Sequence, residues 1–290
     1  MKTFKTIYLV GIIFITIFVV GFFGARRIGR MVGWFDNGGV VKDSVKLEPF
    51  TSIELDADYV DFNIVEDNEY RVDYEYPSNM NVNGKVENGV LKITVKGTPN
   101  TSFSFFQFDK TGIKSVNPSL TVVVPEGTKF DSVNLKANAG DIRLDERIID
   151  SFKAEMDAAD LELDSITAEK MNIQTDAGSV EIFDSSIGDL EVSTSAGEIS
   201  MNSSVSDSVK VSANMGNIEF FNNTFSKGEF KSDMGKISVD GEFEEIKAES
   251  SMGEISVENE NIGTAKVDLS VDLGKVSVNG VNKGNSYKQN

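Results

Sequence analysis

Apolar and polar residues alternate through the second half of the chain, and the pattern recurs about every 19 residues. In the unit around Gly178, the residues Met171, Ile173, Val180 and Ile182 are apolar, and polar residues stand between them. Alternation with period two is typical of a half-buried β-strand, because successive side chains point to opposite faces. Each unit is therefore predicted to hold two short strands that meet near the glycine.

A three-residue turn motif marks this junction in every unit. Its first residue is Asn, Asp or Ser, whose short side chains bond nearby backbone amides in turns. Its last residue is glycine in seven of eight units, which we interpret as a requirement for positive φ. These glycines are Gly140, Gly178, Gly197, Gly216, Gly235, Gly253 and Gly274. Ala159 stands in the remaining unit, so its corner either differs or carries backbone strain.

The middle residue of the turn motif changes along the chain. It is alanine in the first four units, methionine in the next three and leucine in the last, Leu273. We interpret this change as a corner of the core that becomes wider, or less filled by neighbouring side chains, towards the C-terminus.

One unit is too small to bury its own apolar side chains, but stacked units form a continuous core. The predicted fold is all-β, a parallel β-solenoid of about eight 19-residue coils over residues 133–279. Adjacent coils in such a stack lie about 4.8 Å apart. One residue from each coil is then expected in a single inward column, formed by Ile142, Leu161, Val180, Ile199, Ile218, Ile237, Ile255 and Val276.

Residues 47–132 are predicted to form an irregular β cap at the N-terminal end of the solenoid. The alternating segment 53–64 resembles a degenerate first coil. The runs 71–76 and 90–96 are predicted strands, and the segment 81–89 between them is rich in turn residues.

Two further segments bear on the ends of the rod. Phe103, Phe105, Phe106 and Phe108 form an aromatic cluster that either covers the open N-terminal end or binds a partner. The polar C-terminal tail, residues 280–290, either folds over the last coil or leaves that edge free to pair with another chain.

The N-terminus carries a predicted membrane anchor. Residues 6–24 are uncharged and suffice to cross a bilayer as a helix, after a short tail of residues 1–5. Residues 25–46 are predicted to be a juxtamembrane linker. Basic residues flank the span on both sides, so flanking charge does not decide the orientation. A good cleavage site is missing, which favours an uncleaved signal anchor.

Composition limits the chemistry. The formal net charge is −18, which argues against binding of nucleic acid or an anionic membrane surface through bulk charge. The chain has no cysteine and no histidine, so it lacks disulfides, thiolate metal sites and the commonest general base. We expect an acidic domain outside the cytoplasm, held to the cell membrane by a single span, with no cofactor and no catalytic residues.

Stacked carboxylates are the only candidate site that the pattern suggests. Asp141 and Asp160 occupy one outward position on adjacent coils, and Asp164 pairs in the same way with Asp145. Such pairs could bind calcium or take part in glycosidic chemistry on a polysaccharide. Backbone capping in turns explains the same residues without a ligand, and the outward row is mixed in charge further along.

The chain resembles the DUF4097 family of β-strand repeat proteins, described as putative adhesins. The resemblance rests on ELDADYVDFNIV, on VVVPEG and on recurring segments such as AGSVEI, MGNIEF and LGKVSV. It implies an envelope-associated β-solenoid, often anchored by an N-terminal helix, with some relatives in Lia-type envelope-stress loci and no catalytic residues. The expected function is a non-enzymatic adhesin-like, scaffolding or stress-associated surface module with a protein or cell-wall partner. A calcium-supported binding module and a polysaccharide-acting enzyme are the alternatives.

Overall fold

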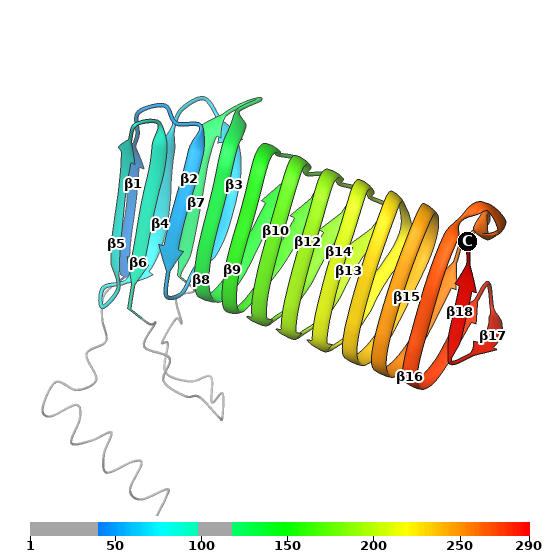
Figure 1. Cartoon of the computed structure of the whole chain (residues 1–290). Helices are drawn as coiled ribbons and strands as arrows, with labels where there is room; N and C mark the ends of the chain where they lie inside the picture. Colours follow the sequence, from blue (N-terminus) through cyan, green and yellow to red (C-terminus); the bar gives the residue numbers. More distant parts are fainter. Residues whose placement is uncertain (1–39, 98–117) are drawn as a thin grey trace, which may run out of the picture. The chain divides into compact units, whose positions relative to one another are not determined.

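The computed structural model describes residues 40–97 and 118–290. Within these ranges the chain forms eighteen strands of one continuous sheet, wound into a rod (Figure 1). The same residues contain no α-helix and one short 3-10 turn, η1 (Ile262–Thr264). The predicted all-β parallel solenoid is confirmed here. The membrane helix predicted for residues 6–24 and the aromatic cluster within residues 98–117 lie outside the described residues.

The strands fall into three groups along the rod. The N-terminal group comprises β1 (Val40–Lys46), β2 (Ser52–Ala57), β3 (Asp61–Asp67), β4 (Arg71–Pro77), β5 (Asn81–Glu87), β6 (Val90–Lys96) and β7 (Ser119–Pro125). The solenoid comprises β8 (Lys129–Asp145), β9 (Ile148–Asp164), β10 (Thr167–Ala177), β11 (Val180–Phe183), β12 (Ser186–Ala196), β13 (Ile199–Asn202), β14 (Val205–Met215), β15 (Ile218–Glu258) and β16 (Lys266–Val278). The chain ends with β17 (Val281–Gly284) and β18 (Ser286–Gln289).

Each coil pairs in parallel with the next at a constant offset. Met171 lies opposite Leu190, and Leu190 lies opposite Val209, so equivalent residues stack on one another. The predicted inward column is confirmed: consecutive members such as Ile142, Leu161 and Val180 are register partners, and all eight residues are buried.

A glycine in the core makes room for several phenylalanine side chains. In one column, Gly228 takes the place held by Val209 in the preceding coil. A Cβ atom at Gly228 would lie 2.6 Å from the rings of both Phe225 and Phe230. The missing side chain therefore makes room for a phenylalanine cluster, in which the rings of Phe220 and Phe230 meet edge to face with centroids 5.0 Å apart.

The glycine corner is shaped by close packing between coils. A Cβ atom at Gly216 would lie 1.8 Å from the carbonyl oxygen of Gly197, and one at Gly197 would lie 2.0 Å from that of Gly178. Six of the seven glycines have positive φ, between 120° and 157°. Gly197 does not have a left-handed φ, so the conformational reason expected there is wrong, and the steric reason holds instead.

Burial and backbone φ decide two further questions about this corner: the conformation at Ala159 and the place of the middle residues of the motif. Ala159 is buried without positive φ, so its corner differs from the six glycine corners that have positive φ. The middle residues of the motif do not fill a widening core, because Met215, Met234, Met252 and Leu273 are all exposed. That interpretation was wrong: these side chains stand on the outside of the corner.

A second corner closes each coil, and the sequence analysis did not identify it. Glu146, Ser165, Asp184, Ser203 and Asn222 occupy equivalent places there and have φ between 45° and 57°. Asn, Asp and Ser tolerate this left-handed conformation or bond locally within it, which accounts for most of these residue types. The signal was present as polar pairs at the end of successive units.

Buried polar side chains connect the second corners of neighbouring coils. The amide of Ile166 donates to Ser185 Oγ over 3.0 Å, and the amide of Ser185 donates to Ser204 Oγ over 3.0 Å. The amide of Ser204 donates to Asn223 Oδ1 over 2.9 Å. The hydroxyl of Ser204 in turn donates to the carbonyl oxygen of Asn202, 2.9 Å away. This row satisfies backbone groups that the turn leaves without strand partners.

The N-terminal group continues the solenoid and then departs from it. Strands β2 and β3 pair in parallel with β8, which agrees with the expected degenerate first coil. Residues 40–46, expected to lie in the linker, form β1 and pair antiparallel with β4. Residues 81–87, expected to be turn-rich, form β5, and only Asn88 and Gly89 make the turn into β6, both with positive φ.

The C-terminal tail folds over the last coil. Strands β17 and β18 both pair antiparallel with β16 (Figure 1). The side-chain amide nitrogen of Gln289, Nε2, also donates a hydrogen bond to the carbonyl oxygen of Ala265 over 2.9 Å. Of the two possibilities left open by the sequence, the chain therefore adopts the self-covering one.

Replacing Gly197 tests the steric corner. We expect Gly197→Ala to lower the free energy of unfolding by about 1–3 kcal/mol, because its Cβ would overlap a carbonyl oxygen of the preceding coil. Ser200→Val, on the outward face of β13 between the two corners of its coil, should change it by less than about 0.5 kcal/mol. Chemical denaturation measures both, and equal effects would contradict the assignment.

The buried polar row gives a second test. Ser204→Ala removes the acceptor for the Ser185 amide and the donor for the Asn202 carbonyl, so we expect a loss of about 1–3 kcal/mol. Ser208→Ala is the matched control, because its hydroxyl bonds Asp189 in an exposed position. Denaturation midpoints of the two variants should differ clearly, and a neutral Ser204→Ala would show that the row is dispensable.

Candidate functional site

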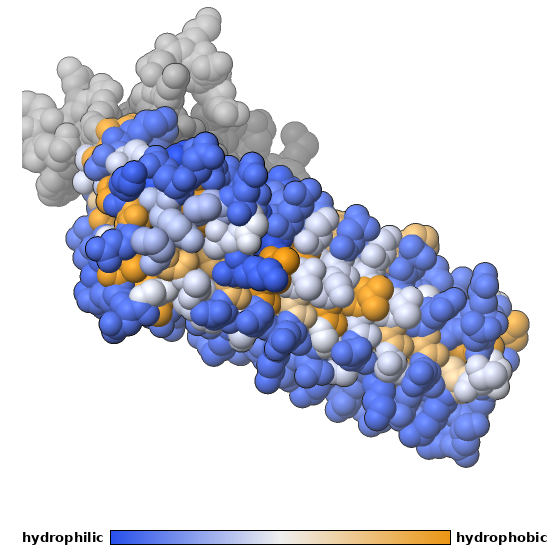
Figure 2. All heavy atoms as spheres, turned by 90° about the horizontal axis from the view of Figure 1, so that it is seen from above, coloured by the Kyte–Doolittle hydropathy of each residue, from blue (hydrophilic) through white to orange (hydrophobic). Residues whose placement is uncertain are grey.

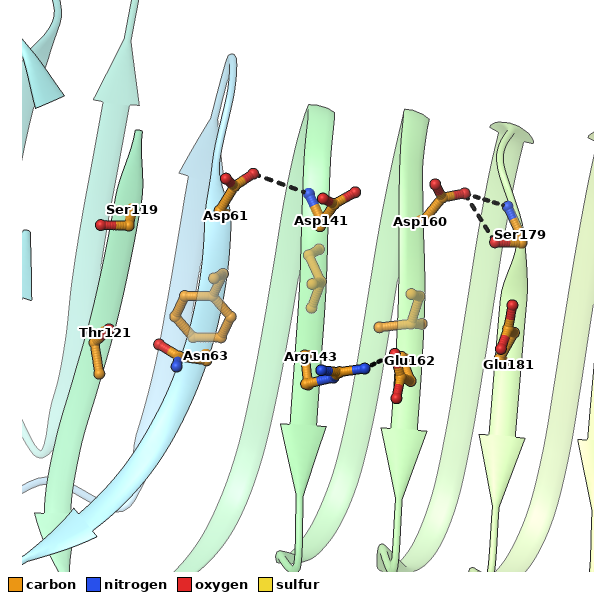
Figure 3. A pocket seen from close by; sticks show the side chains of 13 residues that line it. Asp61, Asn63, Ser119, Thr121, Asp141, Arg143, Asp160, Glu162, Ser179 and Glu181 are labelled. Atoms are coloured by element: carbon orange, nitrogen blue, oxygen red, sulfur yellow. Dashed lines mark hydrogen bonds and ion pairs between the residues drawn. The ribbon is translucent and has the colours of Figure 1, made fainter. Parts of the chain in front are cut away.

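A shallow hollow of about 500 Å³ lies on the face formed by β7, β3, β8, β9 and β11. These strands lie side by side and contribute alternate outward side chains (Figure 3). Phe62, Ile142 and Leu161 point inward beneath it, while polar residues line the surface. The hollow thus sits on a nearly flat sheet, and its walls are side chains rather than loops.

The upper row of this hollow contains the acidic residues singled out from the sequence. Asp141 and Asp160 are register partners on β8 and β9, and Asp61 occupies the equivalent place on β3 (Figure 3). The structure therefore brings two of the three predicted residues together and adds Asp61, which the sequence analysis missed.

Two of these carboxylates, Asp61 and Asp160, accept hydrogen bonds from the backbone of the next coil. Asp160 Oδ1 accepts a hydrogen bond from the Ser179 amide over 2.7 Å and from the Ser179 hydroxyl over 2.9 Å. Asp61 accepts from the Asp141 amide over 3.4 Å. The same contact recurs further along the row, where Asn217 accepts from the Lys236 amide over 3.1 Å. A structural role from coil to coil therefore explains the residue types at this position.

The third predicted residue lies elsewhere. Asp164 is the last residue of β9, four residues beyond Asp160, where it pairs in register with Asp145 and accepts a hydrogen bond from Ser165 Oγ over 2.8 Å. Burial raises the pKa of Asp145, an effect that Arg143 opposes and that the Asp164 carboxylate reinforces. Neither aspartate contributes to the hollow.

The lower row of the hollow is dominated by an ion pair. Arg143 and Glu162 face each other across β8 and β9, and the pKa of Arg143 is raised chiefly by its hydrogen bond to Glu162 (Figure 3). Asn63, Thr121 and Glu181 complete this row. The Arg143 side chain is 58% exposed and that of Glu162 is 37% exposed, so water screens the pair and it contributes little to stability.

Burial gives Asp61 an unusual titration. Burial raises the pKa of Asp61 and so does the Asp141 carboxylate, while the hydrogen bond from the Asp141 amide lowers it. The pKa of Tyr59 is likewise raised by burial and by both carboxylates. The surroundings of Asp61 therefore disfavour its ionised form. Within the described ranges no group of three or more acidic residues is arranged to hold a metal ion.

The carboxylate pair also has limited catalytic geometry. Asp141 and Asp160 stand side by side on adjacent strands and point the same way (Figure 3). Glycosidic chemistry places two carboxyl groups on either side of the scissile bond. The described face offers no such opposed pair around the hollow.

The outer surface of the rod is largely hydrophilic. In the view of Figure 2, apolar and weakly polar surface collects in an interrupted line along the rod, and hydrophilic side chains cover the margins on both sides. Within residues 40–97 and 118–290, no helix combines the length and apolarity needed to span a membrane.

Residues 50–290 match the sequence profile of Toastrack DUF4097. The chain belongs to this family. The DUF4097 resemblance noted from the repeated glycine motifs is thus confirmed over nearly the whole described part of the chain. No curated protein gives a significant match.

Solved structures share the fold of this DUF4097 chain at low identity. A protein from Parabacteroides distasonis described as a putative lipid binding protein has a TM-score of 0.58 at 19% identity, covering 84% of this chain and 96% of its own. One described as a putative adhesin from the same species also has a TM-score of 0.58, at 14% identity and covering 83% and 96%. Another putative adhesin, from Parabacteroides merdae, has a TM-score of 0.50 at 14% identity, covering 84% and 95%.

The titration of Asp61 predicts a pH effect on stability. Since its folded pKa is raised above the usual value of 3.8, stability falls as pH rises from that value through the folded pKa, and the penalty persists at neutral pH. Asp61→Asn keeps an oxygen acceptor for the Asp141 amide and removes the charge, so we expect a higher Tm at pH 7. Below pH 3.8 the two proteins should melt alike. An unchanged or lower Tm at pH 7 would contradict this.

Proposed function

We propose that the chain is a membrane-anchored, extracytoplasmic β-solenoid that acts as a non-enzymatic, adhesin-like or scaffolding surface module. Residues 6–24 supply the anchor in this proposal, and a protein or cell-wall component is the partner. Because some relatives in this family belong to Lia-type loci, the proposal includes a role in the response to envelope stress. The same proposal assigns no binding of nucleic acid, because the chain is strongly acidic.

The uniform coil is the observation that supports this function best. Between β10 and β11 only Gly178 and Ser179 separate the strands, and between β11 and β12 only Asp184 and Ser185 do. Corners this short cannot build walls around a substrate. Solenoids of this kind work through extended surfaces made by the repetition of equivalent positions.

The stacking of equivalent outward side chains along the rod supports the same conclusion. Each outward position repeats at strand spacing along the rod, so a partner with its own repeat can contact several coils at once. Asp160, one of the acids that suggested catalysis or calcium binding, already bonds a backbone amide of the neighbouring coil. The relatives described as adhesins share this architecture, and their descriptions agree with a binding role.

Protease accessibility tests the location. We expect an epitope tag placed after Asn290 on the full chain to be removed when protease is added to intact protoplasts, because the C-terminus then lies outside the membrane. A cytoplasmic protein in the same cells should stay intact. Protection of the tag until detergent is added would overturn the proposed topology.

Proximity labelling on intact cells tests the partner. A labelling enzyme fused to the C-terminus should mark envelope proteins or cell-wall-associated proteins in preference to cytoplasmic ones. The same fusion without residues 1–39 provides the matched control for anchoring. Labelling confined to cytoplasmic proteins would exclude a surface module.

A further inference from the structure

An apolar stripe runs along one edge of the C-terminal half of the solenoid. Its members are the middle residues of the last four glycine corners: Met215 is 51% exposed, Met234 42%, Met252 46% and Leu273 68%. They stack from coil to coil, since Met215 pairs with Met234 and Met252 pairs with Leu273. We call these four residues the corner stripe.

The corner stripe has no counterpart in the N-terminal half. The same position there is held by alanine, from Ala139 to Ala196. Four large apolar side chains held in water have no role in the core, because the strand residues beside them fill it. A contiguous exposed apolar surface of this kind is typical of an interaction site.

The residues beside the corner stripe differ in charge on its two sides. The residue before each middle residue gives one row, Asn214, Asp233, Ser251 and Asp272. The residue after each glycine gives the other row, Asn217, Lys236, Glu254 and Lys275. One row is acidic or neutral, and the other contains two lysines.

The two rows complement each other if two copies meet edge to edge and run in the same direction. A two-fold axis parallel to the rod places the first row of one copy against the second row of the other, coil for coil. Asp233 then faces Lys236 of the second copy, and Asp272 faces Lys275. Within the described residues, Asp233, Asp272 and the Lys236 ammonium make no ion pair, while Lys275 pairs with Glu254 over 3.2 Å.

The opposite direction gives a poorer match. A two-fold axis across the rod places each row against itself in reverse, so Lys236 would face Glu254 of the second copy. Both directions compete with the existing pair between Glu254 and Lys275, but the opposite direction also leaves Asp233 and Asp272 without a cation. The parallel arrangement therefore places more of the acidic side chains opposite a lysine.

The N-terminal half of the solenoid lacks this charge complementarity. The corresponding rows there are Asn138, Asp157, Asp176 and Ser195, and Asp141, Asp160, Ser179 and Glu198, with no basic residue. Parallel copies would bring Asp157 against Asp160, which is repulsive. The four coils that carry large apolar corner residues therefore include two with complementary charges, and the first four coils include none.

We propose that the corner stripe is the interface of a parallel homodimer in which two chains contact each other along their last four coils. Four coils at about 4.8 Å spacing make a contact only about 15 Å long. Stable soluble dimers bury about 800 Å² on each partner, which is more than this contact provides. The association is weak in solution and is strengthened when both chains are tethered to one membrane, which raises their effective concentration. This last step rests on the proposed anchor.

Cysteine cross-linking of the full chain tests the interface. The native chain has no cysteine, so single cysteines report their own surroundings. In phosphatidylcholine vesicles with copper phenanthroline and oxygen as oxidant, Met234→Cys should give at least about fivefold more disulfide-linked dimer than Val205→Cys. Val205 is the matched control, because it is 53% exposed and apolar but begins β14 at the other corner. Equal yields would overturn the proposal.

A charge exchange tests the direction. In the Met234→Cys background, Asp233→Lys would face Lys236 of the second copy, so the dimer yield should fall several-fold. Adding Lys236→Asp exchanges the two rows and should restore the yield. An Asp233→Lys variant without effect, or a higher yield from mixed Met234→Cys and Met252→Cys chains than from Met234→Cys alone, would exclude the parallel arrangement.

Vesicle flotation separates this proposal from the proposed anchor. A chain that fails to float with the vesicles contradicts the anchor alone. The same cysteine and charge variants are then compared in solution at about millimolar chain, the range that tethering produces. Preferential cross-linking of Met234→Cys there would still support the interface, and its absence would overturn it.

Discussion

The close parallel stacking of one coil on the next is the constraint on which this structure depends. Parallel strands lie about 4.8 Å apart, so every residue has its equivalent residue as a neighbour on both sides. At the glycine corner the backbones approach so closely that a Cβ atom would lie within 2.2 Å of a carbonyl oxygen at Gly178 and at Gly197. The residue types at each position follow from what can stand next to a copy of itself.

This constraint explains both the inside and the corners of the rod. Apolar columns suit it, because identical branched side chains pack well in line. Polar residues suit it where each can donate to one neighbour and accept from the other, as Ser185 and Ser204 do. Carboxylates on the outer face avoid mutual repulsion in part by bonding the amide of the next coil, as Asp160 does with Ser179.

The ends of the stack need different solutions, because the last coil has no neighbour. At the C-terminus, β17 and β18 reverse direction and pair with β16, which covers its edge. At the N-terminal end, Arg147 takes the place that a small polar residue holds in later coils. Its guanidinium is buried and reaches the Ile64 carbonyl over 2.9 Å and Glu66 over 3.2 Å. The arginine thereby joins the irregular strands to the regular coils.

The sequence by itself determined the architecture and the inward phase of the strands. A fixed period with alternating polarity leaves few arrangements other than a parallel stack, and it assigned the column from Ile142 to Val276 correctly. It also placed Asp141 and Asp160 on adjacent coils. Asp61 escaped notice because the degenerate first coil lacks the glycine motif that marks the others.

Only the tertiary structure decided what happens at the corners. Alternation assigns a side chain to a face while the backbone is extended, but it carries no information where the chain turns. For this reason Met234 and Leu273 could be taken for core residues although they are exposed, and the second corner at Asp184 went unrecognised. Gly197 is a second example, because a glycine can be required either by a positive φ or by the lack of space for a Cβ atom. Sequence pattern does not separate the two, because they depend on how closely the neighbouring coil approaches.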